Sequence, residues 1–493
     1  MLRTPYQGVF PVTDPVPEAK LPRVLNGTEA LALIVGSVIG SGIFIVPSRV
    51  AQSVPSIAGI AITWVVGGLF SLAGALTLAE LGAMLPSAGG PYVYLKAAFG
   101  RLAAFLFGWT EFLVIRSGSV ATLSAAVALN FAQVYPAPTG LDPRIYQAGV
   151  SIIALSFVAL VNVLGTKRGG LLQVVGTALK LGALGLMVVL PFVLGKASAS
   201  RLAPVWPSAW DGNLFAGIMA AMVGVLWTYD GWVNIAEVAE DVDDPGKNIP
   251  QSLMRGMAIL IGVYLAVTLA YHLVLPMETV AHPSAPGAPF RIVAATFSER
   301  LLGHRGLAAI SLTVMASALI ALNGNAMSGP RAYFAMARDG LFPAGLCRVH
   351  RRFQTPANAI IAQAVWSTIL IVAGTAFLVA EPPSGLPAYL GKAWAKLHAT
   401  PLYDVMYSYV IFGGTILYTA TIASVFVLRR TMPDQPRPYR TWGYPLTPLI
   451  YILASGILLN SMLGTNRFES LAGLAIIALG VPAYFAFRGS SAR

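Results

Sequence analysis

Long apolar stretches, separated by short polar segments, run along almost the whole chain. A helix needs roughly 20 apolar residues to cross about 30 Å of hydrocarbon. The pattern predicts an all-α polytopic membrane protein with twelve transmembrane helices. We place them near residues 27–52, 57–83, 102–136, 146–164, 171–195, 214–238, 249–276, 306–336, 357–379, 403–428, 444–463 and 469–487.

Two of these stretches are interrupted near their middle by small or polar residues. The first reads GSVIGSGIF over residues 36–44, and the second reads LWTYDGW over residues 226–232. An unwound segment at mid-membrane depth exposes backbone groups that lipid cannot satisfy, so it persists only where it lines a site. Two broken helices are therefore typical of a transporter.

The positions of the two breaks indicate an internal repeat. Residues 27–195 and 214–430 would each hold five helices and begin with a broken one. Because five is odd, the second set enters the membrane from the opposite side, which makes a five-plus-five inverted repeat with one central site. Residues 444–487 add helices 11 and 12, and residues 1–26 and 488–493 form the two tails.

Composition agrees with a membrane protein, and charge indicates its orientation. The 493 residues are 56% hydrophobic and 11% charged, with a mean hydropathy of +0.71. Nineteen lysines and arginines lie in the tails and the loops on their side, against nine in the opposite loops. The positive-inside rule therefore predicts a multi-pass protein of the cell membrane with both termini cytoplasmic. The net charge of +12 then faces anionic membrane lipid, and we expect no nucleic-acid partner.

Little in the chain suggests an enzyme. The single cysteine, Cys347, forbids an intrachain disulfide. A membrane enzyme needs a nucleophile with its base or a metal cluster, yet the five histidines are scattered and form no catalytic motif. We therefore expect no catalytic residue, no metal and no cofactor. A nutrient receptor that binds without transport stays open as an alternative.

The first break offers backbone amides. Gly40, Ser41, Gly42 and Ile43 permit an unwound backbone beside a half-helix N-terminus, whose partial positive charge suits a carboxylate. The alternative is that these small residues only allow close helix packing. The presence of a second break favours the binding interpretation.

The second break offers carbonyl oxygens and aromatic surface. An interruption at Asp230 and Gly231 leaves carbonyls near Trp227 and Tyr229 able to accept hydrogen bonds from a substrate ammonium group. Trp227 either gates the site or only packs, and the sequence does not decide between the two. Asp230 either pairs with a cation or caps the second half-helix, and we favour the cap.

Lys180 is the charge that is most costly to place in the membrane. At about 1.5 Å per residue, it lies roughly 14 Å along its helix, close in depth to Ser41. An ammonium group at that depth must be paired or solvated. We expect it to hold its helix against backbone oxygens near Gly36 and a hydroxyl such as that of Ser317, where another transporter places a sodium ion. Snorkelling to an interface is the alternative.

The remaining charges near the spans are interpreted as structural. Glu111 and Arg116 are five residues apart, so they do not share a helix face as i, i+4 pairs do. Residues 381–400 are expected to form an outer loop. An acidic run after the sixth span is interpreted as a solvated loop: Glu237, Glu240, Asp241, Asp243 and Asp244.

Four segments occur in a fixed order: GSVIGSGIF (36–44), AELGAMLPSAGGPYVYLKAAFG (79–100), YDGWVNIAEVAEDVDDPGKNIP (229–250) and GPRAYFAMARDGLFP (329–343). Together they resemble the amino acid, polyamine and organocation (APC) superfamily, closest to its L-type amino acid transporters and related bacterial permeases. The resemblance covers residues 27–487. It implies a substrate held between the two breaks and alternating access by rocking of helix bundles.

The resemblance also assigns roles to residues of this chain. It implies that the segment from Gly40 to Ile43 takes the substrate carboxylate, and that Trp227, Thr228 and Tyr229 take the α-amino group and form the gate. Lys180 matches a lysine of sodium-independent members, which implies proton coupling or obligatory exchange.

The chain departs from the L-type pattern at two places. Val233 and Glu237 stand where L-type members commonly carry an asparagine and an apolar residue. Loop 137–145 lacks the cysteine that joins animal members to a glycoprotein, so we expect no disulfide-linked accessory subunit. The predicted function is sodium-independent secondary transport of amino acids as an exchanger or proton symporter. Neutral L-amino acids are favoured, and a cationic amino acid or polyamine is the alternative substrate.

Overall fold

The computed structural model describes residues 21–284, 291–381, 394, 402–465 and 467–490. Regular structure in this part of the chain is helical, and its only β-type pairing is an isolated bridge between Leu25 and Val242. Eleven helices are long and apolar enough to cross a membrane, and one bent pair makes a twelfth span. The predicted all-α architecture of twelve spans is therefore confirmed. Most of the predicted outer loop at 381–400, except residues 381 and 394, and much of both tails lie outside the described residues.

The spans follow the predicted order. They are α1 (Gly27–Val38) with α2 (Gly42–Ser53), α3 (Ile57–Met84), α5 (Arg101–Thr110) with the π-helix η1 (Glu111–Ile115) and α6 (Arg116–Val134), α7 (Pro143–Val163), α8 (Thr166–Val193), α9 (Gly212–Tyr229), α11 (Pro245–Val274), α14 (His304–Arg338), α15 (Ala357–Val379), α17 (Leu402–Thr431), α18 (Leu446–Thr465) and α19 (Arg467–Ser490). Shorter helices connect them: α4 (Pro91–Phe99), η2 (Ala199–Arg201), α10 (Asn234–Glu237), η3 (Ala239–Asp241), α12 (Met277–Ala281), α13 (Val293–Leu302) and η4 (Ala344–Cys347).

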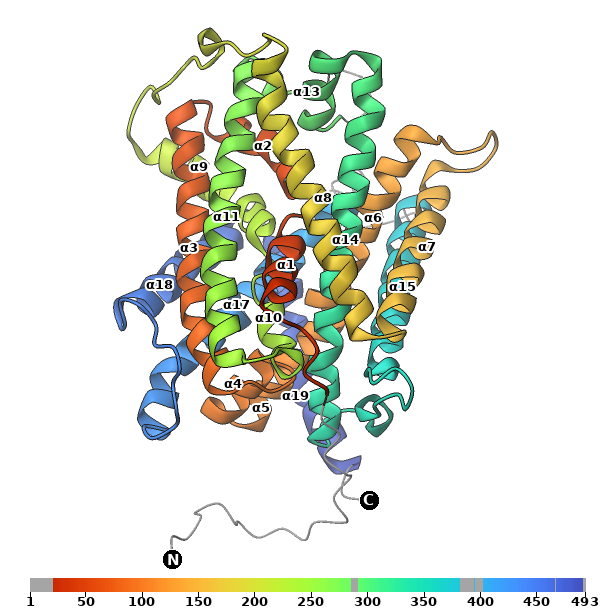
Figure 1. The fold of residues 1–493 in the computed structure, drawn as a ribbon, viewed down its shortest axis with the longest axis vertical. Coiled ribbons are helices and arrows are strands. Elements are labelled where there is room, and N and C mark those ends of the chain that lie inside the picture. The colour runs from red at the N-terminus through yellow and green to blue at the C-terminus, as the bar shows by residue number, and fades with distance from the viewer. Residues whose placement is uncertain (1–20, 285–290, 382–393, 395–401, 466, 491–493) are drawn as a thin grey trace, which may run out of the picture.

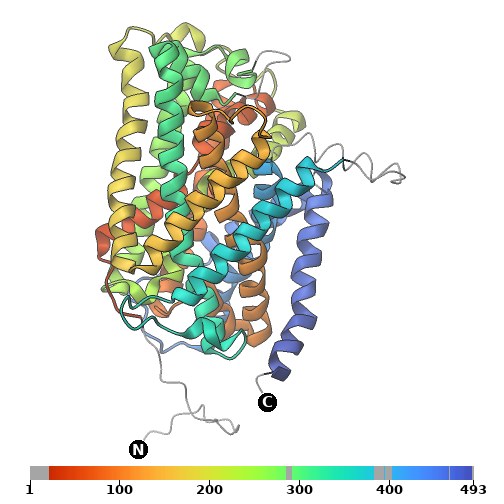
Figure 2. The same cartoon turned by 90° about the vertical axis from the view of Figure 1, so that its right-hand side faces the viewer.

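The spans run along the long axis of the molecule (Figure 1), and the view from the side shows the same direction (Figure 2). The first and last described residues lie at the same end, which is the lower end in both figures. We name it the terminal end. The short helices α4 and α10 lie toward it, whereas α2 and α13 lie toward the other end. Large apolar side chains on the outside of the bundle, such as Leu179 and Leu453, are exposed as expected for a surface facing lipid.

The interrupted first span lies at the centre of the bundle. Asn26 starts α1 with a capping box, because its side chain accepts from the amide of Glu29 while the Glu29 side chain accepts from the Asn26 amide. α1 then packs against α8, α11 and α14, and α14 in turn lies along α6. Helices therefore enclose the break on several sides, so lipid does not reach its backbone.

Candidate functional site

The first break lies where the sequence predicts it. α1 ends at Val38 and α2 begins at Gly42, and the two helices are bent by 44°. Ser41 is the N-cap of α2 without a capping side-chain hydrogen bond, and the Phe44 amide donates to the Ser41 carbonyl at 3.2 Å. The amides of Gly42 and Ile43 begin α2 and have no intrahelical acceptor. They lie at the positive end of the α2 dipole.

Lys180 holds this break from the side of α8. Its side chain is buried, and Nζ donates to the carbonyl oxygens of Gly36 at 2.8 Å, Ile39 at 2.5 Å and Ser317 at 3.0 Å. The snorkelling alternative is therefore wrong. The contact with Ser317 also differs from the prediction, because Lys180 binds its carbonyl oxygen and not its hydroxyl. The Ser317 hydroxyl donates to the carbonyls of Ile39 and Gly40 at 3.1 and 3.0 Å.

The second break separates α9 from a very short α10. Asp230 is extended and Gly231 has a φ of +115°, a conformation that favours glycine. A Cβ at Gly231 would also lie 3.2 Å from the backbone carbon of Ser37. The N-cap of α10 is Val233, and no side chain caps that helix. The predicted capping role of Asp230 is therefore wrong.

The carbonyls at the end of α9 are less free than the sequence suggests. The Trp227 carbonyl accepts from the Asp230 amide at 3.2 Å, and the Thr228 carbonyl accepts from the Tyr264 hydroxyl at 2.8 Å. Each carbonyl oxygen has a second lone pair for a ligand. The Tyr264 hydroxyl also contacts the Val38 carbonyl at 3.1 Å, so one side chain bridges the two breaks.

The two breaks contact each other directly. A Cβ at Gly42 would lie 2.5 Å from Thr228 Oγ1 and 3.0 Å from Thr228 Cα. Gly231 contacts Ser37 in the same region. The structure therefore brings together two segments that lie far apart in the sequence, at the centre of the bundle.

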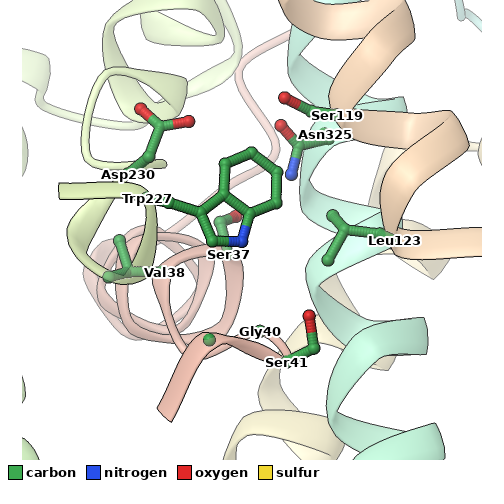
Figure 3. Close-up of a pocket in the computed structure, with 10 residues that line it drawn as sticks. Ser37, Val38, Gly40, Ser41, Ser119, Leu123, Trp227, Asp230 and Asn325 are labelled. Atoms are coloured by element: carbon green, nitrogen blue, oxygen red, sulfur yellow. The ribbon is translucent and has the colours of Figure 1, made fainter. Parts of the chain in front are cut away.

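A small cavity of about 20 Å³ lies between the breaks and the facing helices α6 and α14. In Figure 3 the Trp227 indole fills the middle of this region, with Asp230 on one side and Ser119 and Asn325 on the other. A cavity of this size holds about one water molecule. The cavity is therefore too small for an amino acid in this structure. The lining residues are Ser37, Val38, Gly40, Ser41, Gly42, Ser119, Leu123, Trp227, Asp230 and Asn325.

Some of the predicted site residues line the cavity, and others do not. Gly40, Ser41, Gly42, Trp227 and Asp230 line the cavity. Four other predicted residues lie beside the breaks and do not line it: Ile43, Thr228, Tyr229 and Gly231. The Tyr229 hydroxyl instead donates to the Trp64 carbonyl at 3.2 Å.

Sequence reasoning missed the contribution of the facing helices. Ser119 and Leu123 come from α6, and Asn325 comes from α14. The signal for Ser119 and Asn325 is a polar residue inside an apolar span. Only the packing of α6 along α14 shows that they face the breaks.

A buried cluster of charges lies next to this cavity. Arg116 Nε contacts Glu111 Oε1 at 2.7 Å, so the prediction that these two residues do not share a helix face is wrong. The reason is the π-helix η1, whose i→i+5 geometry places residues five apart on the same side. Arg116 Nη2 also contacts Glu237 Oε1 at 2.7 Å, and all three side chains are buried.

The interpretation of the acidic run between residues 237 and 244 as a solvated loop is wrong at two of its positions. Glu237 pairs with Arg116, and Asp241 is buried with its Oδ2 3.1 Å from Arg331 Nε. Burial raises the pKa of the Asp241 carboxyl, and the Arg331 charge counteracts this shift. Both ion pairs attach the segment after the second break to neighbouring helices.

Twelve apolar spans with two interrupted helices meeting at a central polar cavity define a secondary transporter. The sequence matches the amino acid permease family over residues 25–479, and the chain belongs to that family. The resemblance drawn from the four sequence segments is thereby confirmed.

Three relatives align over nearly the full length of the chain. It is 29% identical to the serine/threonine exchanger SteT of Bacillus subtilis, over 93% of this chain and 95% of that protein. It is 30% identical to the large neutral amino acids transporter small subunit 2 of Mus musculus, over 96% and 84%. It is 28% identical to the cystine/glutamate transporter of Homo sapiens, over 95% and 86%.

Proposed function

We propose that this chain is a secondary active transporter of amino acids that works by alternating access. The observation that carries the proposal is the cavity between the two breaks, with the amides of Gly42 and Ile43 at the start of α2. A substrate carboxylate would bind at these amides. The substrate α-amino group would bind near Trp227, Thr228 and Asp230, on the opposite wall.

Neutral L-amino acids are the favoured substrates. The cavity lining contains one carboxylate, that of Asp230, and otherwise small, apolar or uncharged polar side chains. Two of the relatives are named for serine and threonine or for large neutral amino acids, which supports this preference. Asp230 is the specific observation that favours a cationic amino acid or polyamine as the alternative.

Transport would be independent of sodium. The Lys180 ammonium group donates to three carbonyls at the first break, in the place where a sodium ion would otherwise neutralise them. Exchange and proton symport both remain compatible with a fixed ammonium at this position. The protein would span the cell membrane with its terminal end in the cytoplasm and work without a disulfide-linked subunit.

Trp227 would act as the gate of the site. Its indole fills the space between the breaks, and the remaining cavity admits about one water molecule. Displacement of this ring opens space for an amino acid, and its return covers the bound molecule.

Uptake by purified protein in proteoliposomes tests the proposal. A panel of radiolabelled amino acids is offered with sodium or choline as the external cation, and with or without unlabelled substrate inside. We expect saturable uptake of neutral amino acids that does not change when choline replaces sodium. If no amino acid is transported or exchanged, the proposed function is wrong; binding without flux would indicate a receptor.

A further inference from the structure

Two buried carboxyl groups share one arginine beside the cavity. Glu111 on η1 and Glu237 on α10 each contact the Arg116 guanidinium at 2.7 Å, and none of the three residues is measurably exposed. Because both carboxyl groups contact the same guanidinium, each also acts electrostatically on the other. The Oε2 atom of each has no hydrogen-bond donor among the described residues.

The charges of this cluster do not balance if both carboxyl groups are ionised. Two carboxylates and one guanidinium leave one negative charge buried inside the bundle. An uncompensated charge in such surroundings is strongly unfavourable. An ionised carboxyl group only accepts hydrogen bonds, whereas a protonated one also supplies an O–H donor. One proton bound between Glu111 and Glu237 removes the excess charge and supplies the missing donor.

Among the residues that the structure describes, the other titratable groups that face the cluster add no positive charge. They come from the second break and from three other helices, and they are one aspartate and three tyrosines: Asp230, Tyr94 on α4, Tyr333 on α14 and Tyr418 on α17. An ionised Asp230 would increase the negative charge. These surroundings favour a proton on the glutamate pair.

We propose that Glu111 and Glu237 form a proton-binding site that couples a proton to the transport of the amino acid. This inference rests on the proposed function and assigns its coupling ion. Lys180 is a poor candidate for that role, because three donated hydrogen bonds require the three N–H groups of its ammonium form.

The contacts of Arg116 connect this proton site to the substrate cavity. Its Nη1 donates to Asn234 Oδ1 at 2.5 Å and to Asn325 Oδ1 at 2.7 Å. Asn325 lines the cavity beside Trp227 (Figure 3), whereas Asn234 and Glu237 belong to α10. Loss of the proton would place two carboxylates side by side and weaken the attachment of α10 to η1. Protonation is thereby linked to the position of the segment that follows the second break.

Proton movement is measured in proteoliposomes that contain the full chain and the pH dye pyranine. L-serine or L-leucine is added outside, and internal acidification is recorded together with uptake of the labelled amino acid. Glu111→Gln and Glu237→Gln keep the size and the Oε1 acceptor but cannot take up the proton. Glu278→Gln is the control, since its carboxyl group is exposed and remote from the cluster.

We expect wild-type protein and Glu278→Gln to acidify the vesicles as they import substrate. Glu111→Gln and Glu237→Gln should lose the acidification and the accumulation driven by a pH gradient, yet retain exchange of labelled for unlabelled substrate. Unchanged acidification per imported substrate in both variants would overturn the proposal. The proposal would also be overturned if wild-type protein exchanged amino acids without moving protons. The proposed transport function would stand in that case. Absence of all transport in wild type would instead refute that function.

A second measurement keeps the proposal testable if one of the two variants does not fold. Infrared difference spectra of wild-type protein between low and high pH should contain the carbonyl stretch of a buried protonated carboxyl group. Glu237→Gln or Glu111→Gln, whichever is monodisperse, should lack this band. Its absence from wild-type spectra would contradict the site.

Discussion

Replacement of Lys180 by methionine tests how the first break is held open. Methionine keeps the length and apolar stem of lysine but removes its ammonium group. Three carbonyl oxygens, those of Gly36, Ile39 and Ser317, then lose their charged donor. The Ser317 hydroxyl still donates to Ile39, so the break loses part of its support and not all of it.

The size of the effect follows from two opposing contributions. A hydrogen bond from a charged donor contributes about 1.5–3 kcal/mol, so three lost bonds cost roughly 4–9 kcal/mol. Removal of the ammonium also removes its burial cost, which is about 3 kcal/mol for a lysine at the bilayer centre. The net loss is therefore roughly 1–6 kcal/mol, concentrated at the bend between α1 and α2.

Substrate binding and thermal unfolding in detergent report this loss. Since 1.4 kcal/mol is a factor of ten in affinity, we expect Lys180→Met to bind labelled substrate at least about fivefold more weakly. Its unfolding temperature should also fall. Lys167→Met is the matched control on the same helix, because the Lys167 side chain is 70% exposed. Wild-type affinity and unfolding temperature in Lys180→Met would refute this account of the break. A changed pH profile with intact binding would indicate instead that the coupling proton binds to the Lys180 amine.

Three further substitutions test the site. Gly42→Ala places a Cβ 2.5 Å from Thr228 Oγ1, and overpacking of about 1–3 kcal/mol should reduce uptake, whereas Gly182→Ala has no atom within 4 Å and should transport normally. Equal uptake by both variants would contradict close contact of the breaks. Trp227→Leu removes the indole from the cavity and should speed dissociation of prebound labelled substrate; an unchanged rate would argue against a gate. Asp230→Asn should weaken binding of arginine far more than of leucine if the carboxylate selects cations, and equal effects on both would exclude that role.

The broken spans could be predicted because their signal is local. A glycine or serine cluster inside an apolar run has no place in a continuous membrane helix, and both interruptions appear in the structure at those positions. The contacts of the Lys180 ammonium group were equally predictable. A charge at that depth needs oxygen ligands, and the nearby interrupted backbone supplies them. The repeat boundaries and the roles assigned to the site residues stay predictions.

The buried ion pairs could not be predicted in the same way. The contact between Glu111 and Arg116 depends on a π-helical turn, which changes the helical register by one residue. The apolar pattern of the sequence does not predict such a turn. The partners of Glu237 and Asp241 lie 121 and 90 residues away in the chain, so their burial depends on tertiary packing alone. An acidic run with distant partners has the same local appearance as a solvated loop.

These ion pairs also determine which movements require energy. Arg116 with Glu237 and Arg331 with Asp241 both attach the segment after the second break to α6 or α14, and both are buried. Breaking one buried pair is destabilising by about 3–5 kcal/mol. The central cavity meanwhile admits no more than about one water molecule. In this structure the two ion pairs hold the segment after the second break against α6 and α14, and the cavity is too small for an amino acid. Movement of this segment away from α6 requires the contact between Glu237 and Arg116 to break. If the proposed proton site is correct, an ionised Glu111 would compete for Arg116 and weaken that contact, whereas a bound proton would preserve it.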